Sequence, residues 1–196
     1  IHKKSPWNKF TTIYDCDLAG EVSVIKRRSG ATGVQNLRQF PISDARSILR
    51  NFRELDHDNI INALEFFEEG SLFYVVSEHY PLTMEHLVAS VLFPTENQLG
   101  AILSQTLNGL SFIIAQDFKH HMLICSSILM DLKRKPEEKQ TSDISGLAKI
   151  VMELMQKYAK TDGVVGIDNL DQWPSDSHAV DFLSRTTSAQ SVKELQ

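Results

Sequence analysis

The chain has 196 residues, a formal net charge of −5 and a hydrophobic fraction of 42%, which suit one globular domain or two small lobes with a packed core. The acidic balance argues against a nucleic-acid-binding protein, because such proteins usually carry a basic face. No apolar run is long enough to span a bilayer, and no signal peptide is visible. The two cysteines lie far apart, at Cys16 and Cys125, so we expect reduced thiols in a cytoplasmic or nuclear protein.

The first part of the chain is predicted to form a small sheet with one helix. β-branched and aromatic residues alternate in short runs that are separated by turn-forming residues. An apolar stripe with helical spacing follows a serine that is a suitable N-cap. In chain order we expect a hairpin over residues 10–26, a polar loop over 27–39, a helix from Ser43 to Leu55, and strands over 60–67 and 72–77.

The second part is predicted to be mainly helical. The longest helix, residues 96–115, has leucines at 99, 103, 107 and 110 on one face. Residues 133–141 are charged and contain a proline, which is typical of a loop. The other expected elements are a helix over 82–91, a short strand over 128–130, a helix over 142–158, and short helices over 176–184 and 191–195.

Four segments resemble, in the same chain order, motifs of the protein-kinase domain. Gly20–Lys26 is similar to the third strand with its Val-Ala-Ile-Lys ending, and Leu55–Ile60 to Leu-x-His-Pro-Asn-Ile. Leu72–Glu78 resembles the fifth strand and hinge, and Ser142–Leu147 the Ser-Asp-Val-Trp-Ser-Leu segment. The sterile-twenty group is the most similar in character. This resemblance implies an α+β, bilobal, protein-kinase-like fold within a single domain, with a small β-rich lobe at 1–80 containing one helix and a mainly helical, shortened lobe at 81–196.

The segment His120–Leu129 resembles the catalytic loop of this family with its chemistry replaced. Where the family has an aspartate that accepts the substrate proton, this chain has Met122, and where the family has a magnesium-binding asparagine it has Ser127. A thioether accepts no proton at neutral pH, and a lone hydroxyl is a poor magnesium ligand. Within the resemblance, Asp143 is a structural carboxylate beneath this loop.

Other kinase features are also missing. The glycine-rich phosphate loop is absent, the glutamate that pairs with the lysine is replaced by Ile48, and the alanine that makes room for adenine is replaced by Val24. Only residues 131–141 stand where the Asp-Phe-Gly and activation segments would be. Asp44, one turn before Ile48, is a possible substitute partner for Lys26.

These losses predict a catalytically inactive pseudokinase, not an enzyme, that acts as a protein-interaction scaffold or an allosteric regulatory module. We expect no catalytic residue, no metal ligand and no cofactor. Lys26 is interpreted as a vestigial cofactor-binding residue. The alternative interpretation is that the stem of Lys26 packs against the protein while its ammonium group is solvated. The expected partner is another protein or the rest of a longer chain, with a homodimer possible and no membrane. The alternatives are a residual nucleotide-binding switch or weak atypical protein kinase, and a helical binding module without a strand over 22–26.

Overall fold

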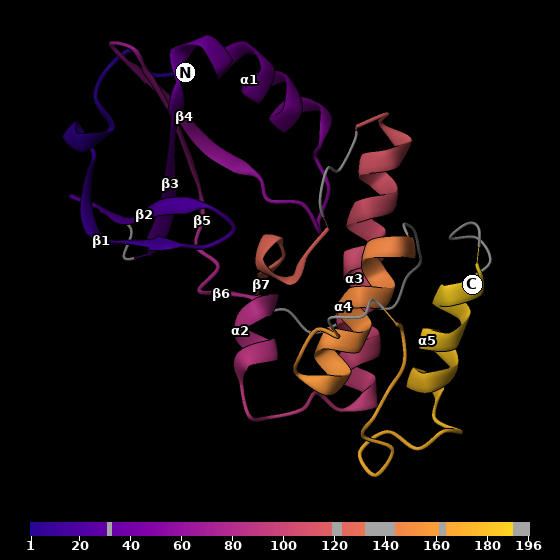
Figure 1. Ribbon diagram of the computed structural model, residues 1–196. Coiled ribbons are helices and arrows are strands. Elements are labelled where there is room, and N and C mark those ends of the chain that lie inside the picture. Colours follow the sequence, from indigo (N-terminus) through magenta and orange to yellow (C-terminus); the bar gives the residue numbers. More distant parts are fainter. Residues whose placement is uncertain (31–32, 119–122, 132–143, 161–163, 190–196) are drawn as a thin grey trace. The chain divides into compact units, whose positions relative to one another are not determined.

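The computed structural model describes residues 1–30, 33–118, 123–131, 144–160 and 164–189. The chain divides into two compact units, Ile1–Pro81 and Leu82–Gln196. The first contains an antiparallel sheet with one α-helix, and the second is mainly helical (Figure 1). The predicted α+β class is therefore confirmed, whereas a single bilobal domain with lobes 1–80 and 81–196 stays a prediction.

The sheet of the first unit has five strands in the order β1-β2-β3-β5-β4, and every neighbouring pair is antiparallel. Four of the five lie within the expected order of elements, including the strand that the helical-module alternative excluded, so that alternative is wrong. The strands are β1 (Phe10–Asp17), β2 (Glu21–Arg27), β3 (Val34–Pro41), β4 (Ala63–Glu69) and β5 (Leu72–Glu78).

Strand β3 corrects the prediction of a loop over residues 27–39. The polar residues of β3 interrupt the alternation that predicts a strand. In the structure, β3 is hydrogen-bonded on both sides, to β2 and to β5. Leu37 packs in one apolar cluster of the sheet and Phe40 in another. Cross-strand pairing and burial therefore override weak strand propensity.

Helix α1 (Ala45–Glu54) packs on one face of the sheet (Figure 1). It is preceded by the 3-10 turn Ile42–Asp44, so its N-cap is Asp44 and not Ser43. Because side chains alternate along a strand, β5 contributes to both faces. Phe73 and Val75 face α1 with Ile48, Leu49 and Phe52, and the other face buries Phe10, Ile25, Leu37, Phe67, Tyr74 and Val76.

The second unit contains a pair of two-residue strands, of which the first precedes the helices and the second follows the first two of them. β6 (Leu82–Thr83) pairs with β7 (Leu129–Met130), so the helix expected from residue 82 begins two residues later, as α2 (Met84–Ala89). The predicted helix over 96–115 is confirmed as α3 (Glu96–Ala115). Its N-cap is Thr95, which forms a capping box with Gln98.

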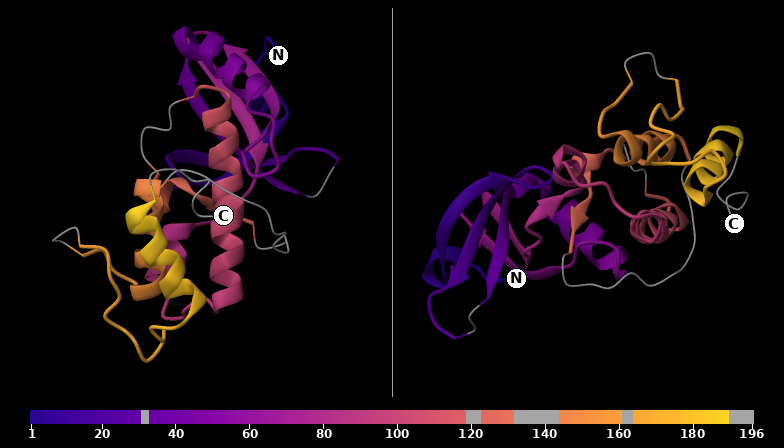
Figure 2. Two further views of the ribbon diagram at one scale, coloured as in Figure 1. Left: turned by 90° about the vertical axis from the view of Figure 1, so that its right-hand side faces the viewer. Right: turned by 90° about the horizontal axis from the view of Figure 1, so that it is seen from below.

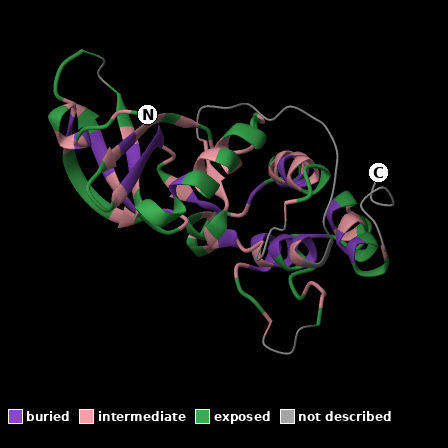
Figure 3. Cartoon of the chain, turned by 90° about the horizontal axis from the view of Figure 1, so that it is seen from above, coloured by how far each residue is buried: buried purple, intermediate pink, exposed green. Residues whose placement is uncertain are grey.

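Helix α4 (Ile144–Gln156) is the core of the second unit, and α3 and α5 (His178–Ser188) lie beside it (Figure 2). Leu147, Ile150, Leu154 and Met155 of α4 are almost completely buried. Figure 3 shows the buried residues on the strands and on the facing sides of these helices. In the part of the chain that the structure describes, no helix is long and apolar enough to cross a membrane.

Candidate functional site

The turn between β1 and β2 stands where a kinase-like domain has its phosphate-covering loop. Leu18 N donates to Gly20 O over 3.0 Å, and Gly20 N donates to Asp17 Oδ1 over 3.0 Å. Ala19 and Gly20 have positive φ angles of 58° and 101°, and Leu18 is buried. These bonds and the buried leucine make the turn tight and fixed.

Arg38 of β3 holds this turn from the neighbouring part of the sheet. Its guanidinium donates to Ala19 O over 3.0 Å and also to Leu18 O. Burial lowers the pKa of Arg38, and the charge of Asp17 opposes that change, so the group remains a cation at neutral pH. We call these two hydrogen bonds the Arg38 tether.

Replacing Gly20 by alanine is expected to destabilise the first unit by about 1–2 kcal/mol. Its φ of 101° strains any L-residue, and an added Cβ would lie 3.1 Å from Arg38 Nη1. Gly30→Ala is a matched control, because its φ is 95° and its Cβ would meet nothing within 4 Å. Urea unfolding should therefore show a larger loss for Gly20→Ala than for Gly30→Ala. Equal losses of stability in the two variants would show that the close approach of the added Cβ to Arg38 does not contribute to the destabilisation.

Asn36, two residues before Arg38 in β3, is a buried polar residue in the middle of the sheet. It pairs with Val24 in β2 and with Ser77 in β5, and it is 0% exposed. Its Oδ1 lies 2.8 Å from Nδ1 of His79. Burial lowers the pKa of His79, so a neutral ring donates from Nδ1. Asn36 Nδ2 is buried and without a hydrogen-bond partner among the described residues.

The strand order changes which residue stands before the helix. The resemblance gave that place to Lys26, but the strand that leads into α1 is β3, and its cation is Arg38. Lys26 pairs with Val34, four residues before Arg38, so the two backbone positions are about 13 Å apart along the sheet. By the same strand order, Asn36 rather than Val24 stands where the kinase family has the alanine that makes room for adenine, next to the hinge. A cofactor-binding role for Lys26 stays a prediction.

The sequence contains only a weak signal for β3. Leu37, Phe40 and the turn-forming glycines that precede them fit a hairpin, and the polar residues between them concealed it. Ile48 of α1 packs against the sheet, which explains why an apolar residue stands at this position. Asp44 occupies the N-cap position of that helix without a side-chain capping bond, and its carboxylate accepts a hydrogen bond from Ser43 Oγ.

Part of the segment that resembles the catalytic loop lies outside the described residues, as do other residues of that resemblance. This applies to His120, Met122, Asp143 and the charged segment 133–139. Ser127 is described: its hydroxyl donates to Ile124 O over 2.8 Å and accepts from Ile124 N. In the described ranges no group of three or more His, Cys, Asp or Glu residues could hold a metal ion.

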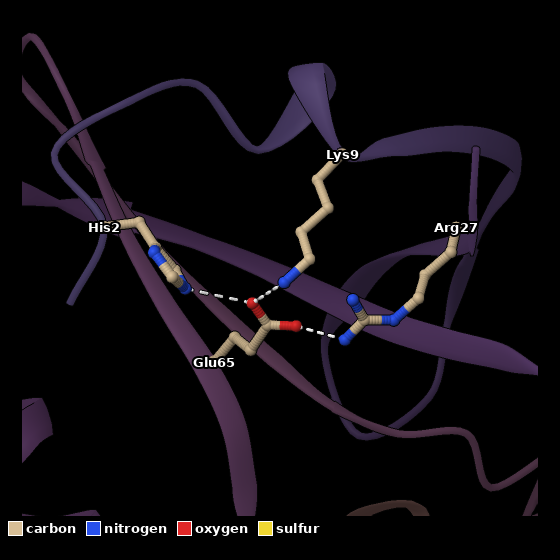
Figure 4. A network of polar contacts seen from close by, with 4 residues as sticks. All are labelled: His2, Lys9, Arg27 and Glu65. Carbon is tan, nitrogen blue, oxygen red and sulfur yellow. Dashed lines mark hydrogen bonds and ion pairs between the residues drawn. The ribbon is translucent and has the colours of Figure 1, made fainter. Parts of the chain in front are cut away.

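A second polar cluster gathers around Glu65 of β4 (Figure 4). The carboxylate contacts His2, Lys9 and Arg27, and its side chain is 12% exposed. The backbone of His2 bonds along β4, through its N–H to Phe66 O and its carbonyl to Glu68 N. The cluster therefore fastens the N-terminal segment and β2 to β4, which is a structural role.

The comparisons with known proteins agree with a kinase-like interpretation over part of the chain. Cyclin-dependent kinase 12 of Drosophila melanogaster is 34% identical over 108 residues, which cover 49% of this chain and 9% of that protein. Calcium-dependent protein kinase 4 of Plasmodium berghei is 29% identical over 100 residues, or 48% of this chain and 19% of that protein. The same kinase from Plasmodium falciparum is equally similar. The chain thus spans less than a fifth of these relatives, and no family model matches it.

These matches correct one prediction. The expectation that the chain is not an enzyme is wrong by this comparison, because the proteins that it resembles are named as kinases. What they support is a kinase-like domain. They support neither the sterile-twenty group nor the loss of activity.

Proposed function

We propose that the chain is a protein-kinase-like domain that regulates another protein by binding it, as a scaffold or an allosteric module. The Arg38 tether is the observation that carries this proposal. It ties down the carbonyls of Leu18 and Ala19, in a turn whose amides would have to close over a nucleotide phosphate. A turn held in this way gives a rigid surface, and rigid surfaces lose little conformational entropy when they bind a partner.

The Asn36–His79 pair supports the same proposal. Kinase-like domains place a small residue next to the hinge so that a purine ring can enter. Here an amide side chain is buried in that place and bonds to His79 in the segment after β5. At two positions that the resemblance assigns to nucleotide binding, polar groups are therefore engaged by the protein's own contacts.

A second candidate is a nucleotide-binding switch or a weak atypical protein kinase. The matches to proteins named as kinases favour it. Arg38 offers a cation at the β1–β2 turn, and it could pair with a phosphate if it released Leu18 O and Ala19 O. The two candidates differ in whether the Arg38 tether opens for a nucleotide.

A thermal-shift experiment with ATP, with and without Mg²⁺, separates the two candidates. A ligand at one hundred times its dissociation constant stabilises the folded state by about 2.7 kcal/mol, which a melting curve detects. The first candidate predicts no Arg38-dependent shift at saturating nucleotide. A shift that Arg38→Ala abolishes and Lys26→Ala preserves would replace it with the second, as would phosphate transfer that requires Arg38.

The partner itself is sought by pull-down and mass spectrometry, followed by binding measurements with the purified candidate. The expected partner is another protein, the rest of a longer chain, or a second copy of this chain. Sedimentation velocity of the purified chain tests the last of these. A chain that stays monomeric and binds none of the purified candidates would contradict a scaffold role.

A further inference from the structure

An open hollow of about 570 Å³ lies at the end of the β1–β2 hairpin that is opposite the Arg38 tether. The strand register shows this separation, because Thr11 pairs with Lys26 at this end and Asp17 pairs with Glu21 at the other. The five residue-to-residue steps from Glu21 to Lys26 span about 17 Å. The residues that matter for its chemistry are Thr11, Lys26, Arg28, Ser29, Gly30 and Gly33.

The hollow is positively charged in a chain with a net charge of −5. No acidic residue is among those that line it. Lys26 is exposed and has no ion-pair or hydrogen-bond partner among the described residues. Arg27, between the two other cations, is already bound to Glu65. The net charge offered to a ligand therefore comes from Lys26 and Arg28.

Arg28 is held in place before any ligand arrives. Its Nε lies 2.9 Å from Trp7 O and 3.1 Å from Phe10 O. These bonds use the inner edge of the guanidinium, and the two Nη groups have no partner in the described part of the chain. A guanidinium fixed at one edge and open at the other can form paired hydrogen bonds to an oxyanion with little loss of side-chain freedom.

Two glycines line the hollow. A Cβ built on Gly30 or on Gly33 would meet no atom within 4 Å, so neither is a glycine because of close packing. Gly30 has a φ of 95°, which explains its identity, whereas Gly33 has no positive φ that would require a glycine. Backbone without side chains lets amide groups approach an anion closely. Ser29 and Thr11 add hydroxyl groups at the edge.

We propose that this hollow binds a phosphate monoester, with Lys26 and Arg28 as the charged ligands. Two cations, two hydroxyl groups and exposed backbone match the several acceptor oxygens of a dianionic phosphate. The group could be part of a small molecule or of a phosphorylated side chain, and both carry the same oxyanion. This site is separate from the nucleotide region at the Arg38 tether, so it stands whichever proposed function is correct.

The test is an amide-proton NMR titration of the full chain at low ionic strength, with inorganic phosphate in one arm and O-phosphoserine in the other. Saturable shifts are expected at the amides of Lys26, Ser29, Gly30 and Gly33. Tighter binding of O-phosphoserine is expected, because it carries the proposed phosphate monoester, whereas tighter binding of inorganic phosphate would overturn the monoester in favour of a free phosphate ion. Shifts that do not saturate, or that sodium chloride reproduces at equal ionic strength, would overturn the proposal.

Three variants give the test its controls. Lys26→Gln is expected to weaken phosphate binding about tenfold, in line with the loss of a charge-assisted contact, and it removes no side-chain hydrogen bond or ion pair between described residues. Lys149→Gln, at an exposed lysine of α4, changes the net charge equally and should alter affinity less than twofold. Gly33→Ala should weaken binding without any change in charge, because it adds a methyl group to a residue that lines the hollow. Equal effects of Lys26→Gln and Lys149→Gln would show that only net charge matters.

Discussion

Replacing Trp173 by alanine is expected to lower the free energy of unfolding of the second unit by about 3–5 kcal/mol. The side chain is only 2% exposed and belongs to the apolar cluster formed around α4. Its Nε1 donates to Met155 O over 2.9 Å, so the truncation also leaves a buried carbonyl near the helix end without this donor. The cavity and the lost hydrogen bond act in the same direction.

Urea unfolding monitored by circular dichroism measures this loss. Trp173→Phe keeps most of the apolar volume but removes the N–H group, and we expect about 1–2 kcal/mol for it. Trp7→Ala is the matched control in the first unit, where the side chain is half-buried, and its effect should be clearly smaller than that of Trp173→Ala. A Trp173→Ala variant that is as stable as the wild type would mean that the indole is not part of the core.

Replacing Glu65 by alanine is expected to destabilise the first unit by about 2–3 kcal/mol, which is below the value for a fully buried ion pair because the cations are partly solvated. The side chain is 12% exposed, and those of Lys9 and Arg27 are 36% and 27% exposed. Removing the carboxylate leaves these two cations, together with His2, without their shared acceptor. Glu69→Ala, at an exposed position of the same strand, should change stability by less than about 0.5 kcal/mol.

The Glu65 cluster also predicts how stability depends on pH. Burial alone raises the pKa of Glu65, but the hydrogen bond from Lys9 and the charges of Arg27 and Lys9 outweigh it, so the pKa is lower in the folded state. Because the pKa of Glu65 is lower in the folded state, the ionised carboxylate stabilises the fold. This stabilisation is fully present above the pKa of the unfolded state, about 4.3, and is lost as the pH falls through the pKa of the folded state. Glu65→Gln should therefore flatten the decline of stability in this acidic range. An unchanged slope would remove Glu65 as its cause.

The sequence predicted the elements whose signals are local. Helix α3 was predicted with its bounds correct because its leucines repeat at helical spacing. Strand β5 was predicted because it is a nearly continuous apolar run, and six of its seven residues are at least half-buried in the sheet. The kinase-like character of the chain was likewise visible in short motifs, and the partial matches to named kinases agree with it.

The placement of the candidate site could not be predicted in this way. It depends on β3, whose polar residues become a strand only because β2 and β5 provide hydrogen-bonding partners on both sides. Residues 34–41 pair with residues 72–78, and such a long-range register leaves no local trace in composition. The resemblance therefore placed Lys26 before the helix, where the tertiary structure places Arg38.

By itself, the amino-acid sequence determined the fold class, the long helix, most strands and the resemblance to kinases, because hydrophobic periodicity and capping act between near neighbours. Only the tertiary structure decided that Arg38 holds the β1–β2 turn, that Asn36 is buried beside His79, and that Lys26 and Arg28 line a hollow at the other end of the hairpin. The physical reason is that these contacts join strands whose pairing is set by burial across the whole sheet.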